Sequence, residues 1–326
     1  MGPVGERRAR YGMMALLACG GGAVAMAPGW APLWVALALV TTAWPLWEAW
    51  RAARGTALRG AVFWVILAVG LGIAAQIGAW DDPPSSGRVV AGYWAYLSVL
   101  ATLAGLISVL NARTPGGGAW ALLMALLVLV FLIPWLEAPG MARGAGGLAR
   151  LRLGSPWTLF YVLLVTAGVT NYIPTRYGAA AAWLALGFTL EYVALTRDWW
   201  TRATRSLAWS AVPWTLAVAI WTARWRSRRV VVPQGGSGLE ATWIWFRDHW
   251  GVVWALRVQE RFNRTAEVMK WPVRLGWHGV VPALGIAPGA VPGVPDGAEA
   301  TLRGLLRRFA DPARIGEAVD RVRARP

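Results

Sequence analysis

The stretch RWRSRR, residues 224–229, divides the chain into two parts of different composition. Before it, long apolar runs follow one another with few charges. After it, charges of both signs return, and no apolar run is long enough to cross a bilayer. Because arginines beside a span favour the cytoplasmic face, this predicts a transmembrane domain over residues 1–229 and a cytoplasmic domain over residues 230–326. Four arginines of the stretch would anchor this topology: Arg224, Arg226, Arg228 and Arg229.

The composition also favours a membrane. The chain has 326 residues, of which 57% are hydrophobic, and its mean hydropathy is +0.45, whereas a soluble domain is about 45–50% apolar. Lys270 is the only lysine, and this arginine bias, with abundant Ala, Gly, Pro and Trp, is typical of a high-GC bacterial genome. We therefore expect a multi-pass protein of the bacterial inner (plasma) membrane.

The apolar runs predict an all-α polytopic membrane domain of about eight spans, since a span needs about 20 apolar residues. The predicted spans are residues 11–27, 30–47, 61–80, 89–110, 119–136, 157–173, 178–196 and 207–223. With eight spans both termini are cytoplasmic, and the inner loops then hold more arginines than the outer loops. The first, sixth and eighth runs are slightly short, so seven and nine spans remain alternatives.

The single cysteine, Cys19, excludes a disulfide within the chain and a cysteine-based metal cluster. The sequence Leu16-Leu17-Ala18-Cys19 resembles a bacterial lipobox, the site where a lipoprotein is cleaved and its cysteine acylated. The apolar core before Cys19 is short for a signal peptide, however, and apolar sequence continues after it. A first membrane helix with a buried thiol is therefore the preferred interpretation.

Residues 230–326 predict a small, mostly α-helical cytoplasmic domain. Ser237 and Glu240 have the spacing of a capping box, and apolar residues then recur at helical spacing until Pro272 stops the helix. Gly251 is a weak point in this helix. Residues 273–277 alternate between apolar and other residues, which predicts a short strand.

A loop rich in proline and glycine is expected over residues 282–295. Two shorter helices should follow. The first would be capped at Asp296, and the second would begin at Asp311-Pro312 and reach about Arg323.

The long helix of this tail carries an aromatic face, formed by Trp243, Phe246, Trp250 and Trp254. We predict that this face docks on the anionic inner leaflet or on another membrane protein. Nucleic acid is disfavoured as a partner, although the net charge is +16, because acidic residues are interleaved with the arginines.

Glu191 is the acidic residue that lies well inside an apolar run, and an intramembrane carboxylate is a candidate functional group. Asn171 and Arg176, from the neighbouring hairpin, are its candidate partners. Alternatively, Glu191 lies near the end of its span and pairs with Arg197 at the interface. Asn171 would then only bridge helices through hydrogen bonds.

The sequence contains no phosphate-binding glycine motif, zinc-protease motif or nucleophile elbow, and it identifies no catalytic, cofactor-binding or metal-ligating residue. Whether the protein uses a cofactor is not predicted. Three functions compete. The leading one is a non-catalytic scaffold, assembly factor or partner subunit. The others are a transporter or channel with Glu191 in the pathway, and an intramembrane enzyme acting on a lipid. An enzyme would need clustered acids or histidines at one membrane face, and the two histidines lie in the tail.

Overall fold

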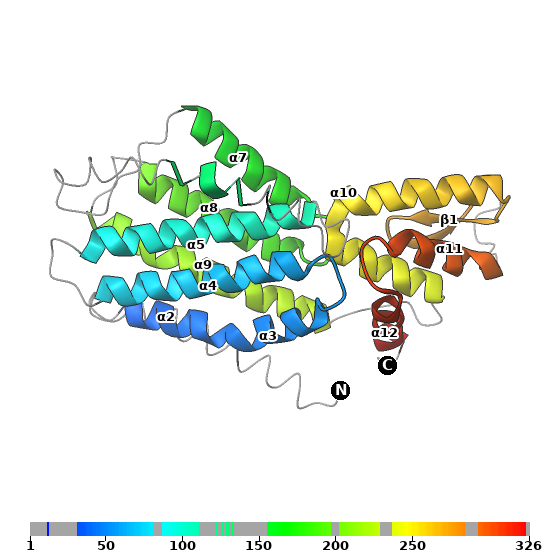
Figure 1. The fold of residues 1–326 in the computed structure, drawn as a ribbon, viewed down its shortest axis with the longest axis horizontal. Helices are drawn as coiled ribbons and strands as arrows, with labels where there is room; N and C mark the ends of the chain where they lie inside the picture. Colours follow the sequence, from blue (N-terminus) through cyan, green and yellow to red (C-terminus); the bar gives the residue numbers. More distant parts are fainter. Residues whose placement is uncertain are drawn as a thin grey trace.

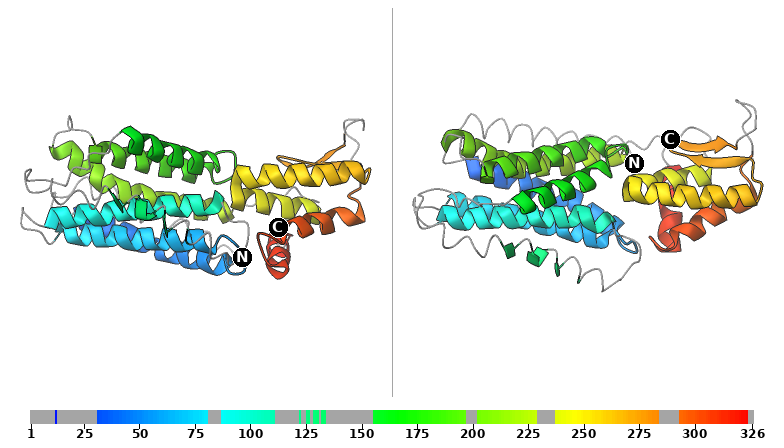
Figure 2. Two further views of the ribbon diagram at one scale, coloured as in Figure 1. Left: turned by 45° about the horizontal axis from the view of Figure 1, so that its top comes forward. Right: turned by 90° about the horizontal axis from the view of Figure 1, so that it is seen from above.

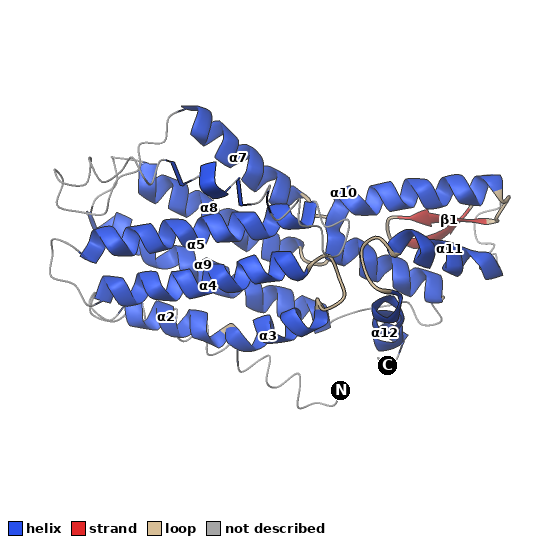
Figure 3. Ribbon diagram, in the orientation of Figure 1, coloured by secondary structure: helices blue, strands red, loops and turns tan. Residues whose placement is uncertain are grey.

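The computed structural model describes residues 31–80, 87–110, 155–196, 202–228, 237–283 and 293–323, with single positions at 12 and between 122 and 133. The described chain is mostly helical, with one two-stranded sheet (Figure 3). Helices α2 to α9 lie side by side as an elongated bundle. The remaining elements form a separate group beyond one end of it (Figures 1 and 2). We call these two parts the bundle and the tail.

The bundle consists of helices that are mostly apolar. They are α2 (Ala31–Thr41), α3 (Ala43–Ala52), α4 (Arg59–Trp80), α5 (Gly87–Leu110), α7 (Ser155–Thr170), α8 (Gly178–Thr196) and α9 (Arg202–Arg228). Six of the eight predicted apolar runs thus fall on helices. The runs at 11–27 and 119–136, and Cys19 with them, lie outside the described residues except for single positions.

The run at 30–47 is not one continuous helix. Thr42 separates α2 from α3, and its hydroxyl donates to the carbonyl of Leu39 at 2.6 Å. Pro45 explains the interruption, because it has no N–H to donate to the carbonyl of residue 41. The prediction of a single span there is therefore corrected to two shorter helices that continue to Ala52.

Within the described residues, one stretch is long and apolar enough to cross a bilayer, Arg59–Ile77 in α4. Shorter apolar stretches are found at Trp94–Leu110, Thr158–Thr170 and Gly178–Val193. The bundle also exposes large apolar side chains around its outside. Among them are Leu37, Val40, Trp44, Trp47, Phe63, Ile77, Leu159, Val162 and Leu163.

The tail is built around α10 (Gly238–Val268). Ser237 caps this helix as predicted, accepting from the backbone N–H of Glu240 at 3.2 Å. The prediction of one uninterrupted helix is wrong, because Gly251 has φ 75° and ψ −172° and α10 folds back there into two arms (Figure 1). Both arms contact one strand, through Trp243 Nε1 to the carbonyl of Gly276 at 2.8 Å and Gln259 Nε2 to the carbonyl of Leu275 at 2.9 Å.

The strands are β1 (Val273–Gly276) and β2 (Gly279–Pro282), an antiparallel hairpin with Val273 opposite Pro282. The first is the predicted strand, and the second lies at the edge of the predicted loop. Helices α11 (Asp296–Leu306) and α12 (Pro312–Arg323) complete the tail. The bounds of α12 confirm the prediction. Asp296 is not the cap of α11, as predicted, but its first residue, and Pro295 occupies the cap position.

The tail has its own apolar core, and the predicted docking face is part of it. Trp243, Phe246 and Trp250 have no exposed surface, and Trp254 has 6%. Phe246 and Trp250 stack on each other, and Phe309 packs edge-on against both of them. The prediction that this face is presented to the membrane or to a partner is therefore wrong. An amphipathic pattern indicates that one face of a helix is buried but not what buries it. Here the other elements of the tail bury this face.

The tail is joined to the bundle through backbone hydrogen bonds to the loop between α3 and α4. The N–H of Ala57 donates to the carbonyl of Phe309, and the N–H of Asp311 to that of Gly55, both at 2.9 Å. Arg314 Nε donates to the carbonyl of Arg54 at 2.7 Å. Loop residues 57 and 58 also pack on the tail core, so the bundle and the tail are in direct apolar contact at this loop.

Candidate functional site

Glu191 lies on α8 in the middle of the bundle and is 1% exposed. Among the residues that the structure describes, neither of its carboxylate oxygens has a hydrogen-bond partner. A carboxylate removed from water costs several kcal/mol unless an ion or hydrogen-bond donors compensate it. A buried carboxyl group without hydrogen-bond partners is a candidate site for an ion, a proton or a ligand.

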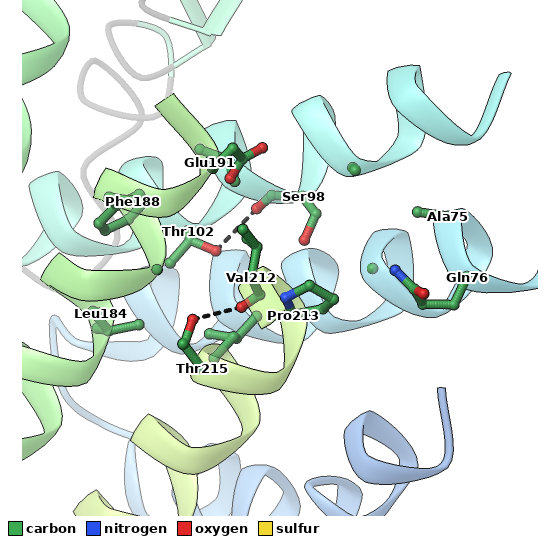
Figure 4. A pocket seen from close by; sticks show the side chains of 15 residues that line it. Ala75, Gln76, Ser98, Thr102, Leu184, Phe188, Glu191, Val212, Pro213 and Thr215 are labelled. Atoms are coloured by element: carbon green, nitrogen blue, oxygen red, sulfur yellow. Dashed lines mark hydrogen bonds between the residues drawn. The ribbon is translucent and has the colours of Figure 1, made fainter. Parts of the chain in front are cut away.

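Glu191 borders a cavity between four helices, shown from close by in Figure 4. The space between its side chains, including its open mouth, is about 510 Å³. Its walls are mostly small or aliphatic. The polar side chains that line it are Gln76 from α4, Ser98 and Thr102 from α5, Glu191 from α8 and Thr215 from α9.

Small residues allow the helices to come together beside this cavity. A Cβ on Gly187 of α8 would collide with the hydroxyl oxygen of Thr215 on α9. A Cβ on Gly72 of α4 would lie 3.3 Å from the hydroxyl oxygen of Ser98 on α5. Close approach at small residues is typical of helix packing in membranes. Here it brings hydroxyl groups from two helices to the cavity that Glu191 borders.

The three hydroxyl groups of the cavity all donate their protons to backbone carbonyls. Ser98 donates to Ala68 at 2.7 Å, Thr102 donates to Ser98 at 2.9 Å, and Thr215 donates to Val212 at 2.6 Å. A carbonyl can only accept, so each hydroxyl is left with free lone pairs and no proton for the cavity.

The predicted partners of Glu191 are not in this cavity. Asn171 and Arg176 lie in the turn between α7 and α8, at the other end of α8, where they bind the tail. Arg197, the alternative partner, lies outside the described residues. The prediction that Glu191 pairs with Asn171 and Arg176 is therefore wrong, because both residues lie in the turn before α8 and Glu191 lies near the far end of that helix.

Asn171 instead holds the kink of α10. Its Nδ2 donates to the carbonyl of Trp250 at 3.3 Å, and its Oδ1 and backbone oxygen accept from the N–H groups of Val253 and Val252 at 3.0 and 2.9 Å. The hydroxyl of Tyr172 donates to the carbonyl of His249 at 3.0 Å. A break in a helix leaves such groups without helical partners, so two residues of the bundle cap both arms of α10.

A buried ion cluster accompanies this contact. Asp248 of α10 is buried and pairs with Arg176 of the bundle at 3.3 Å. Arg247 binds the same carboxylate at 2.8 Å and donates to the carbonyl of Trp277 at 2.6 Å. The sequence does not single out Asp248, because on an uninterrupted helix this residue falls outside the apolar face.

The remaining predicted positions lie elsewhere. Arg224 at the end of α9 forms an ion pair with Glu48 of α3, and Arg226 lies over the ring of Trp225. Arg229 lies outside the described residues. His249 Nδ1 lies 2.7 Å from the carbonyl of Trp245, so this nitrogen carries the proton. In the described part of the chain, His, Cys, Asp and Glu side chains do not gather in a group of three that could hold a metal ion.

Comparison of the chain with protein-family models, with curated proteins and with solved structures gives no match. The function is therefore argued from the cavity and its residues.

Proposed function

We propose that this protein is a multi-pass membrane protein of the bacterial plasma membrane, and that its bundle binds a cation beside Glu191 and carries it across the bilayer. One observation carries the proposal. A buried carboxylate borders a cavity between four helices, and no described group donates a hydrogen bond to it. Intramembrane carboxylates in this situation mark pathways for ions and protons.

The distribution of polarity supports the membrane part of the proposal. Large apolar side chains cover the outside of α2, α3, α4 and α7, while Gln76, Ser98, Thr102 and Glu191 are buried. A bundle in water keeps its polar groups outside, and exposed apolar area of this extent marks contact with lipid or protein. One stretch of α4 is also long enough to span a bilayer by itself.

The cavity favours cation transport over the scaffold function that the sequence suggested first. That hypothesis relied on scarce buried charge and on a free aromatic face of the tail. The carboxylate of Glu191 is buried without a described hydrogen-bond partner, and the aromatic face is buried in the core of the tail. A purely structural subunit gains nothing from an uncompensated carboxylate, which lowers its stability.

The test is flux through the purified protein in liposomes. Uptake of ²²Na⁺ and of protons, the latter followed with a trapped pH-sensitive dye, is compared for wild type, Glu191→Gln and Glu260→Gln. Glu260 is an exposed acid of the tail and serves as the matched control. We expect flux above that of empty liposomes in wild type and Glu260→Gln, and a loss of at least tenfold in Glu191→Gln. Equal flux in all three variants, or none in wild type, would contradict the proposal.

A further inference from the structure

We infer that the ion held beside Glu191 is a dehydrated monovalent metal cation of the sodium type, coordinated by the carboxylate together with the hydroxyl oxygens of Ser98, Thr102 and Thr215. This inference rests on the proposed function and names its substrate. It follows from three properties of the cavity: the direction of its hydrogen bonds, its charge and the chemistry of its oxygens.

The cavity presents acceptors. The hydroxyl protons of Ser98, Thr102 and Thr215 are engaged by the carbonyls of Ala68, Ser98 and Val212. The carboxylate of Glu191 can only accept when it is ionised. Among the residues that line the cavity, Gln76 alone carries side-chain N–H donors. An anion would meet the lone pairs of these hydroxyl groups, so the cavity is suited to a cation.

The charge of the cavity fixes the charge of the ion. Glu191 is the only ionisable side chain among the lining residues, and the walls around it are apolar. A monovalent cation neutralises one carboxylate, whereas a divalent cation would leave an uncompensated positive charge in a medium of low dielectric constant. A water molecule would fill the space but would leave the carboxylate charge in place.

The oxygens fix the class of ion. Carboxylate and hydroxyl oxygens are hard ligands, and they bind hard cations in preference to softer transition metals. The oxygens come from α5, α8 and α9, three of the four helices that line the cavity (Figure 4). Coordination by several oxygens distinguishes a metal cation from a proton, which would need Glu191 alone.

The experiment measures equilibrium binding and does not depend on flux. Thermal unfolding of the full chain in detergent is followed in NaCl, KCl, NH₄Cl or choline chloride at one ionic strength and pH. A ligand that binds only the folded protein raises the Tm, and the rise grows with the logarithm of its concentration once this exceeds the Kd. We expect the Tm to rise with NaCl in wild type. In Glu191→Gln the apparent affinity should fall by at least about 100-fold, as when one partner of a buried charge pair is removed.

The hydroxyl variants separate a metal site from a proton site. Thr102→Val and Thr215→Val each remove one ligand oxygen at nearly constant volume and should weaken Na⁺ binding about tenfold each. Thr102→Ser keeps the oxygen and should restore binding. Thr189→Val is the matched control, because this exposed threonine of α8 does not line the cavity and donates to the carbonyl of Ala185. Each variant is compared with its own Tm in choline chloride, so a general loss of stability does not affect the result.

Three results would overturn the inference. The first is a Tm that does not distinguish NaCl from choline chloride, and the second is Na⁺ binding that survives both valine variants. The third is a Tm that responds to pH or to NH₄Cl but not to the metal salts, which would identify a proton or ammonium site and leave the proposed transport intact. Conversely, Na⁺ binding that depends on Glu191 without any flux in liposomes would support the inference and refute transport.

Discussion

Asn171 occupies the space in which residue 251 would carry a side chain. A Cβ built on Gly251 would lie 2.6 Å from the backbone oxygen of Asn171 and would overlap its amide group. The two residues are 80 positions apart, one in the turn between α7 and α8 and the other at the kink of α10. The reversal of α10 and its attachment to the bundle are therefore the same contact.

Gly251→Ala tests this contact. Its φ of 75° and ψ of −172° lie in a region that only glycine occupies without strain, and the new methyl group would displace Asn171. We expect a loss of at least about 2 kcal/mol in the stability of the tail, measured by chemical unfolding with tryptophan fluorescence. Gly304→Ala is the control. Gly304 lies inside α11 with open space around it, so alanine there should stabilise by about 0.5–1 kcal/mol. Equal effects at the two positions would contradict the argument.

Asp248→Asn tests the buried ion cluster. The substitution leaves the guanidinium groups of Arg176 and Arg247 beside a neutral amide, and removing one partner of a buried pair costs about 3–5 kcal/mol. We expect a lower Tm and faster proteolysis between the bundle and the tail. Glu260→Gln is the comparison, since its pair with Arg264 is 3.9 Å long and exposed, and an exposed pair contributes less than about 1 kcal/mol. A loss no larger than that of Glu260→Gln would show that the cluster is not structural.

Lys270→Gly should stabilise the tail. Lys270 follows the end of α10 with φ 53°, a conformation that costs a side chain energy and that glycine adopts freely. The backbone N–H of Trp271 donates to the carbonyl of Ala266 at 2.8 Å, which closes the helix end in this geometry. We expect a gain of about 0.5–1 kcal/mol in the free energy of unfolding. Lys270→Ala, which removes the charge but keeps the Cβ, should give no such gain.

The proposed topology is tested by labelling single cysteines in whole cells. In a Cys19→Ala background, Ser86→Cys would lie in an outer loop and Ser237→Cys on the inner side, at the start of the tail. A membrane-impermeant maleimide should label residue 86 in intact cells and residue 237 only after the cells are opened. Labelling of both residues in intact cells, or recovery of the protein in the soluble fraction, would refute a plasma-membrane protein with an inner tail.

The helices of the bundle were predictable because their signal is local. A run of about 20 apolar residues identifies a helix without reference to the rest of the chain, and six runs fall on helices. In the tail, the local sequence pattern was not sufficient to predict the structure. Apolar residues keep helical spacing on both sides of Gly251, so periodicity predicts one helix, and the reversal depends on Asn171 and Tyr172 from another part of the chain.

Burial of the aromatic face could not be decided from the sequence for a related reason. Trp243, Phe246 and Trp250 would show the same spacing whether they faced a membrane, a partner or their own core. Glu191 stood out because a carboxylate is conspicuous in an apolar run. Ser98, Thr102 and Thr215 did not, because hydroxyl residues are common in such runs and only the packing of helices brings these three to one cavity.

The capping of α10 by Asn171 and Tyr172 imposes an order on biosynthesis. These two residues leave the ribosome before α10, within the hairpin of α7 and α8. The caps of α10 are complete only when that hairpin has formed. Residues 237–326 expressed alone would carry a chain reversal with four backbone groups lacking their partners. A chain in which the hairpin of α7 and α8 fails to form would therefore also leave the reversal of α10 uncapped.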